Sequence, residues 1–112
     1  MKRIEAIIRP AKVGEVCAAL DKAGQPGVTV SMVEGQGSQK GWINQVRGVA
    51  HTVNMLVKAR VEVVVADDHA DAIIKVIRDA ALTGAVGDGK IFVHDLANAI
   101  RIRTNESGMA AL

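Results

Sequence analysis

Aromatic side chains are almost absent from this sequence of 112 residues, which has one phenylalanine, one tryptophan and no tyrosine. Proteins that bind single-stranded nucleic acid commonly stack its bases on aromatic side chains. Phe92 and Trp42 alone are too few to build such a surface. We therefore expect no nucleic-acid partner.

Cysteine, long apolar runs and clustered charge are also scarce. Cys17 is the only cysteine, so the chain can form no internal disulfide. No apolar run approaches membrane-spanning length, and no basic segment followed by an apolar one opens the sequence. The fourteen basic residues are scattered and nearly balanced by twelve acidic ones. These features predict a cytoplasmic protein that is not itself embedded in a membrane.

The apolar content is that of a globular protein. It amounts to 49% of the residues and consists mainly of valine, isoleucine, alanine and leucine. A chain of this length is enough for one domain with one core, and it leaves no room for a separate catalytic domain. We expect residues 1–112 to form a single domain.

The spacing of apolar residues predicts two β-α-β units with a long loop between them. Helical spacing covers residues 12–23, before Gly24 as a C-cap, and a segment from an N-cap at Asp67 or Asp68 to about residue 82. Strand-like patterns cover residues 3–9, 28–33, 58–65 and 91–94. This order is typical of a ferredoxin-like α+β fold, an antiparallel βαββαβ sheet with both helices on one face.

The predicted sheet has a second face that no helix covers. The strand at residues 58–65 carries apolar side chains on both of its faces between Val61 and Val65. An apolar sheet face of this kind is usually covered by another element or another subunit. We therefore predict an oligomer in which this face meets a neighbouring subunit.

The segment of residues 36–57 joins the two halves of the chain and shows no sustained period of either kind. It is bordered or interrupted by Gly35, Gly37 and Gly41. We expect one long loop without regular structure. Connections of this length are uncommon in compact domains and are usually functional. This loop is the first feature of the sequence that points to function.

Residues 83–90, from Thr83 to Lys90, form a loop punctuated by three glycines. Small residues let backbone N–H groups approach an anion, and Lys90 adds positive charge. Arg101 and Arg103 add two guanidinium groups, which a final extended stretch at residues 99–103 would place on the same side. The pattern is neither a Walker A motif nor a dinucleotide-binding fingerprint. We interpret it as a candidate phosphate site, with a tight turn and a solvated edge strand as alternatives.

Two more residues at the ends of the long loop are candidates for ligand contacts. Gln39 offers an amide between glycines that permit close backbone approach, although a flexible loop base would use the same residues. Lys58 can pair with a carboxylate ligand or can be an exposed lysine at the start of a strand. The sequence by itself leaves both pairs of alternatives open.

A catalytic constellation is not visible in the sequence. His51, His69 and His94 lie apart, and none has a second ligand three or four residues away. Cys17 lies on an apolar helix face, where we expect it to pack in the core. We predict that the protein is not an enzyme, and a small ATPase remains as a weaker alternative because no base is poised by a partner residue.

A metal site in the long loop is another alternative. His51, Met55 and Met32 could bind a soft or borderline metal if the loop folds back. The chain would then be a small metal-binding module of ferredoxin-like fold.

Taken together, these stretches resemble the PII nitrogen-regulatory signal-transduction proteins over nearly the whole chain. The resemblance is carried by residues 4–10, 35–41, 47–48, 83–93 and 101–104. It implies a homotrimer with an adenine nucleotide, ATP or ADP, in each cleft between subunits. It also names residues 36–57 the T-loop and residues 83–90 the B-loop.

The resemblance also assigns ligand-binding roles by position. It implies that the phosphates are held by Gly87, Asp88, Gly89, Lys90, Arg101 and Arg103, that Thr29, Glu62 and Val64 line the adenine and ribose region, and that Gly35, Gly37 and Gln39 lie beside the nucleotide. It further implies that Gln39 helps to hold Mg²⁺ with ATP and 2-oxoglutarate, and that 2-oxoglutarate contacts Lys58 and Gly41.

The T-loop departs from the usual pattern of this family. Val46 and His51 stand where tyrosines are usual, so tyrosine modification at position 51 cannot occur, and Ser38 replaces a common arginine. The resemblance implies that the T-loop regulates a partner protein, such as a transporter or an enzyme of nitrogen metabolism. The alternative is a divergent member tied to metal or bicarbonate transport that senses a metal through His51.

Overall fold

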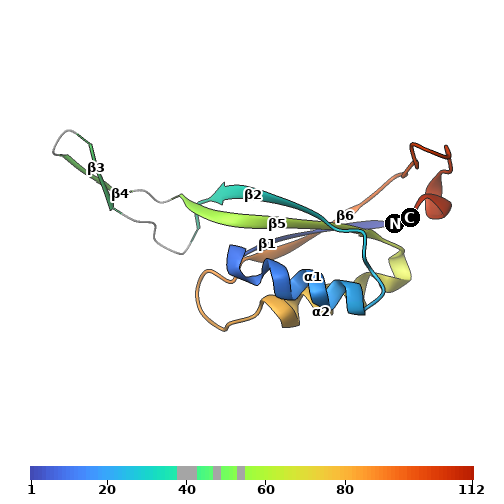
Figure 1. The fold of residues 1–112 in the computed structure, drawn as a ribbon, viewed down its shortest axis with the longest axis horizontal. Coiled ribbons are helices and arrows are strands. Elements are labelled where there is room, and N and C mark those ends of the chain that lie inside the picture. The colour runs from blue at the N-terminus through green and yellow to red at the C-terminus, as the bar shows by residue number, and fades with distance from the viewer. Residues whose placement is uncertain (38–42, 47–48, 53–54) are drawn as a thin grey trace.

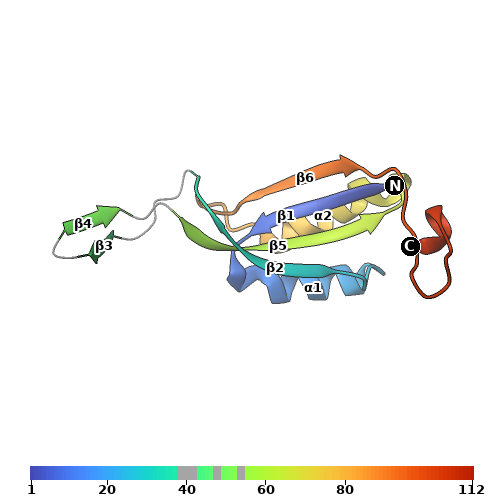
Figure 2. The ribbon, with the colours of Figure 1, turned by 90° about the horizontal axis from the view of Figure 1, so that it is seen from above.

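A computed structural model describes residues 1–37, 43–46, 49–52 and 55–112. The strands are β1 (Lys2–Ile8), β2 (Thr29–Gly35), β3 (Ile43–Val46), β4 (Val49–Thr52), β5 (Leu56–Val65) and β6 (Lys90–Asp95), and the helices are α1 (Val13–Lys22) and α2 (Ala70–Ala81). Strands β2, β5, β1 and β6 form, in that order, an antiparallel sheet. Both helices cover one face of this sheet (Figures 1 and 2), which confirms the predicted ferredoxin-like α+β fold.

The core lies between this sheet face and the two helices. In β1, Ile4, Ala6 and Ile8 are buried while the residues between them are only partly covered. The same alternation buries Ala59, Val61, Val63 and Val65 in β5, and the first three of these are directly opposite Ile8, Ala6 and Ile4 in the antiparallel register. Alternation of period two therefore directs one row of each strand towards the helices.

Each helix buries a stripe of residues spaced by three or four positions. In α1 these are Val16 and Leu20, and in α2 they include Ile73 and Ile77. Gly24 follows α1 with a φ of +85°, and its N–H donates to Asp21 O at 3.0 Å. The predicted glycine C-cap is thus confirmed, because a positive φ suits glycine.

The start of α2 differs from the prediction. A short 3₁₀ turn, Asp67–His69, precedes the helix, and neither aspartate caps α2 with its side chain. Asp67 instead pairs with the N-terminal amine at 2.8 Å. The predicted N-cap at Asp67 or Asp68 is therefore wrong. The carboxylate of Asp67 pairs with the N-terminal amine, and a local sequence pattern does not reveal such a contact.

The T-loop segment also differs from the prediction of a structureless loop. Strands β3 and β4 pair antiparallel from Ile43 with Thr52 to Val46 with Val49, and β5 begins as early as Leu56. Figure 1 shows this hairpin beyond the ends of β2 and β5. The predicted loop was too long because β3 and β4 have only four residues each, too few for an alternating apolar pattern to be recognised in the sequence.

The C-terminal segment is not the extended stretch predicted for residues 99–103. The chain turns at residues 102–104, and Ile100 pairs with Ser107 in an isolated bridge. The N–H of Asn105 donates to Arg101 O, and the N–H of Arg101 donates to Glu106 O, both at 2.8 Å. The prediction failed because these contacts fold the segment back on itself, so period-two geometry does not apply to it.

The face of the sheet away from the helices, which we call the open face, is mixed in character. On β5 it presents Arg60, Glu62 and Val64, while Val61, Val63 and Val65 lie under the helices. On β6 it presents Phe92, which is opposite Glu5 of β1. The open face is therefore less apolar than predicted. In the part of the chain that the structure describes, no helix has the length and apolar content needed to cross a membrane.

Candidate functional site

A cavity of about 500 Å³ lies where the B-loop meets the ends of β2 and β5. Its walls are formed by Ile7, Gly35, Gln36, Gly37, Leu56, Lys58, Val86, Gly87, Asp88, Gly89, Lys90 and Phe92. Seven of the residues predicted for ligand binding are among them: Gly35, Gly37, Lys58, Gly87, Asp88, Gly89 and Lys90. The fold thus brings together three segments that are far apart in the sequence, and we call this space the B-loop cavity.

Five other predicted residues, all in the described part of the chain, do not line this cavity. Thr29 and Glu62 are opposite each other in the register of β2 and β5, and Val64 lies further along β5. Arg101 and Arg103 belong to the C-terminal segment, which lies at the opposite end of the sheet from the B-loop (Figure 1). A single chain therefore presents these predicted residues in two separate parts.

Three predicted ligand residues lack a described side chain. Gln39 and Gly41 lie outside the described residues, and His51 is placed in β4 by its backbone only. Among the described residues, no group of three or more histidine, cysteine, aspartate or glutamate side chains is arranged to hold a metal ion. Cys17 is half-buried and is not one of the core residues, so the expectation that it packs in the core is wrong.

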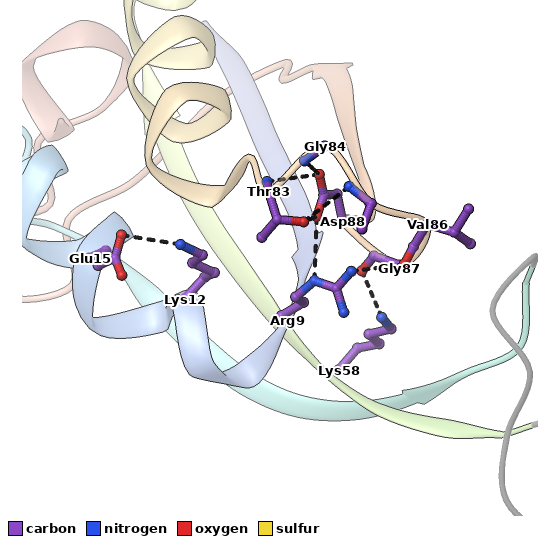
Figure 3. A network of polar contacts seen from close by, with 10 residues as sticks. Arg9, Lys12, Glu15, Lys58, Thr83, Gly84, Val86, Gly87 and Asp88 are labelled. Atoms are coloured by element: carbon purple, nitrogen blue, oxygen red, sulfur yellow. Dashed lines mark hydrogen bonds and ion pairs between the residues drawn. The ribbon is translucent and has the colours of Figure 1, made fainter.

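The carboxylate of Asp88 organises the B-loop from within (Figure 3). Its Oδ2 accepts hydrogen bonds from the backbone N–H of Thr83 at 2.9 Å and of Gly84 at 2.8 Å. Its Oδ1 accepts from the Thr83 hydroxyl and from Arg9 Nε at 3.3 Å. The Thr83 hydroxyl and the other donors hold the pKa of Asp88 well below its usual range, because they stabilise the charged form.

Arg9 is a site residue that sequence reasoning missed. It follows β1 and, besides its bond to Asp88, donates from Nη2 to Val86 O at 2.8 Å. Arg9 and Asp88 are half-buried and lie 79 positions apart in the sequence. The only local signal was a cation at the end of a strand just before Pro10, and such a cation has no unique meaning without the tertiary contact.

Lys58 reaches the B-loop from β5. Its Nζ donates to Gly87 O at 2.9 Å, so it contacts the same loop as Arg9, at the residue between the two that Arg9 contacts (Figure 3). Burial lowers the pKa of Lys58, and the nearby Arg9 charge lowers it further, while Asp88 opposes the shift. The lysine predicted to bind a carboxylate thus lies at the wall of the cavity beside a second cation.

Lys90 is another cation in the cavity wall besides Lys58. It begins β6, opposite Ile7 of β1, and is exposed. Among the described residues its ammonium group makes no hydrogen bond or ion pair. Among the described residues that line the cavity, the two lysines outnumber the one carboxylate, that of Asp88, which is itself paired with Arg9. The cavity is therefore positively charged and suited to an anion.

A family model, curated relatives and a solved structure all relate this chain to the same protein family. The family model of Nitrogen regulatory protein P-II matches residues 1–106. The nitrogen regulatory protein P-II of Rhizobium meliloti (strain 1021) is 51% identical over 112 residues, which are 100% of both chains. Nitrogen regulatory protein GlnK of Escherichia coli (strain K12) is 46% identical over the same full lengths. The crystal structure of Arabidopsis thaliana PII bound to citrate aligns with a TM-score of 0.82 at 39% identity, covering 99% of this chain and 91% of that one.

Proposed function

Since the chain belongs to the P-II family of nitrogen regulatory proteins, we propose that it is a signalling protein that binds ATP or ADP at the clefts of a homotrimer. Its output is regulation of a partner protein through the conformation of the T-loop, and it acts in the cytoplasm without catalysing a reaction. One observation carries this proposal above all, the positively charged cavity between the glycine-rich B-loop and Lys58.

The B-loop cavity has the chemistry of a phosphate site. Gly87 and Gly89 have positive φ angles of 105° and 96°, so the backbone can present N–H groups where side chains would otherwise intrude. Lys90 and Lys58 line the cavity and supply positive charge, while the charge of Asp88 is paired with Arg9. A polyphosphate is the ligand class that such a set of backbone and cationic donors favours.

The remaining nucleotide contacts would come from a second subunit. Thr29, Glu62 and Val64 on the sheet would meet the adenine and ribose, and Arg101 and Arg103 would meet the phosphates. This arrangement explains why one chain holds the predicted residues in two separate places.

The effector ligand in this proposal is 2-oxoglutarate, bound together with Mg²⁺ and ATP. Lys58 at the cavity wall would pair with one of its carboxylates, and Gln39 and Gly41 would contact the metal and the effector. The Arabidopsis thaliana relative was crystallised with citrate, which is also a polycarboxylate. A carboxylate ligand is therefore compatible with this fold.

The regulated partner is a transporter or an enzyme of nitrogen metabolism that contacts the T-loop. A second candidate function is a link to metal or bicarbonate transport, favoured by histidine in place of tyrosine at position 51. Metal titration of the parent protein and of His51→Ala separates the two. Identical titrations would remove the metal-sensing alternative.

Isothermal titration calorimetry with ATP and with ADP tests the main proposal. Lys90→Ala is expected to raise the Kd of both nucleotides about tenfold or more, because it removes a cation at the phosphates. The matched control is Lys75→Ala on α2, where Lys75 pairs with Asp79 at 2.6 Å on the surface and where we expect a change below about twofold. Failure of the parent protein to bind either nucleotide at millimolar concentration would overturn the proposal.

A further inference from the structure

We propose that Asp88 is the positioning residue of the B-loop, that Arg9 tethers it to the end of β1, and that its carboxylate does not itself bind phosphate or metal. This inference rests on the proposed nucleotide-binding function and concerns how the same site is held in shape. It changes the role that family resemblance alone suggests for this side chain.

The hydrogen bonds of the Asp88 carboxylate leave it little capacity for a ligand. Its Oδ2 accepts from two backbone N–H groups, those of Thr83 and Gly84, at 2.9 and 2.8 Å. Its Oδ1 accepts from the Thr83 hydroxyl and from Arg9 Nε. An ionised carboxylate has about four lone-pair sites, and four donors already face it. A metal ion or a nucleotide hydroxyl would have to displace one of these donors.

The donors to the Asp88 carboxylate come from the start of the B-loop and from the end of β1, so the carboxylate links these segments. Thr83 and Gly84 begin the B-loop and Asp88 lies near its end, so their hydrogen bonds close the base of the loop. Arg9 lies outside the loop and donates both to Asp88 and, from Nη2, to Val86 O at 2.8 Å. The loop is therefore closed on itself and fastened to β1 (Figure 3).

Electrostatics distinguishes a positioning role for Asp88 from a direct contact with phosphates. A free carboxylate beside phosphates would repel them, and removing it would tighten nucleotide binding. In the structure Arg9 Nε lies 3.3 Å from Asp88 Oδ1 and offsets its charge. If Asp88 orders the loop, removing it instead frees residues 83–88 to take other shapes, and the cost of ordering them weakens binding. The two roles therefore predict changes of opposite sign.

A metal-ligand role makes a third prediction. A residue that held Mg²⁺ would matter for the magnesium complex of ATP and not for ATP in a chelator. A positioning residue would matter equally in both conditions, because the shape of the loop does not depend on the metal. Nucleotide titrations with Mg²⁺ and with EDTA consequently separate the roles.

The test uses variants that change one feature at a time. Asp88→Asn keeps the size of the side chain and removes its charge, and Thr83→Val keeps the charge of Asp88 and removes the hydroxyl donor. Thr83→Ser restores a hydroxyl and serves as the rescue. Asp79→Asn, an exposed carboxylate on α2, is the matched control for loss of one negative charge.

We expect Asp88→Asn and Thr83→Val to raise the Kd of ATP about tenfold, both with Mg²⁺ and in EDTA, as for loss of a hydrogen bond to a charged group. Thr83→Ser and Asp79→Asn are expected to stay within about twofold of the parent. Tighter or unchanged binding by Asp88→Asn, or a loss confined to the Mg²⁺ condition, would overturn the inference.

Hydrogen exchange of the ligand-free protein provides a readout that needs no nucleotide. The amides of Thr83 and Gly84 donate to Asp88, so their exchange is expected to accelerate in Asp88→Asn and not in Asp79→Asn. If these amides exchange equally fast in the parent protein, the positioning role is wrong. If they are protected but the parent binds no nucleotide, the proposed function fails while the loop assignment stands.

Discussion

At the scale of single residues, Gly89 is a position where the surrounding backbone leaves no room for a side chain. Its φ is +96°, and a Cβ built there would lie 1.6 Å from the carbonyl oxygen of Ile7. The obstacle is the backbone of β1, which is paired with β6 at this point and cannot move aside without breaking that pairing. Glycine is required here by both its conformation and the space available.

Gly89→Ala should therefore lower the free energy of unfolding by about 1–3 kcal/mol, because a strained backbone must be accommodated beside a rigid strand. Gly14 in α1 is the matched control, since a Cβ there meets nothing within 4 Å. Gly14→Ala should raise the free energy of unfolding by about 0.5–1 kcal/mol through helix propensity. Denaturant unfolding measures both changes, and effects of the same sign would refute this account of Gly89.

At the scale of elements, the B-loop is held by a charge whose effect depends on pH. Hydrogen bonds from the Thr83 hydroxyl, from backbone N–H groups and from Arg9 hold the pKa of Asp88 well below its usual value of 3.8. A carboxyl group with a lowered pKa in the folded state stabilises that state fully at pH values above its unfolded pKa. The contribution is lost as the pH falls below 3.8 towards the folded-state pKa.

The stability difference between the parent protein and Asp88→Asn should follow this dependence. We expect the difference in free energy of unfolding to be constant near neutral pH and to shrink as the pH falls below about 4. Asp67, whose pKa is also lowered through its bond to the N-terminal amine, is present in both proteins and cancels in the comparison. Urea titrations in a series of buffers measure the difference, and a difference that grows at acid pH would contradict the prediction.

Long elements could be predicted from sequence, and short ones could not. The alternation of Ile4, Ala6 and Ile8 predicted β1, and the helical spacing of Val16 and Leu20 predicted α1, because burial on one face repeats locally. The four-residue strands β3 and β4 were missed, as was the turn after Ile100. These elements depend on pairing between segments and not on a repeated local pattern.

At the scale of the whole molecule, the open face is the surface at which we predict contact with neighbouring subunits. Phe92 on this face is 45% exposed, although it is a large aromatic residue. Val93, its neighbour in β6, points to the helix side of the sheet and is 48% exposed. Phe92 and Val93 are thus similarly exposed but lie on opposite faces of β6.

We expect Phe92→Asp to dissociate the predicted homotrimer, because it places a charge in the apolar part of the subunit contact. Val93→Asp should leave the assembly intact, since that side chain lies on the face that carries the helices. Size-exclusion chromatography with light scattering measures the mass, and circular dichroism checks that both variants are folded. A monomeric parent protein, or equal dissociation of both variants, would show that the open face is not the subunit contact.

The sequence by itself determined the ferredoxin-like fold and the glycine-rich B-loop, because residue types and their spacing within each segment indicate the strands, the helices and the turns between them. Only the tertiary structure decided that Arg9 fastens the B-loop, that Asp88 faces the loop's own donors, and that the C-terminal arginines lie at the far end of the sheet. The physical reason is that Arg9 and Asp88 are 79 positions apart and meet only once the sheet has brought its strands together, while the loop contacts of Asp88 and the place of the C-terminal segment depend on how the chain turns.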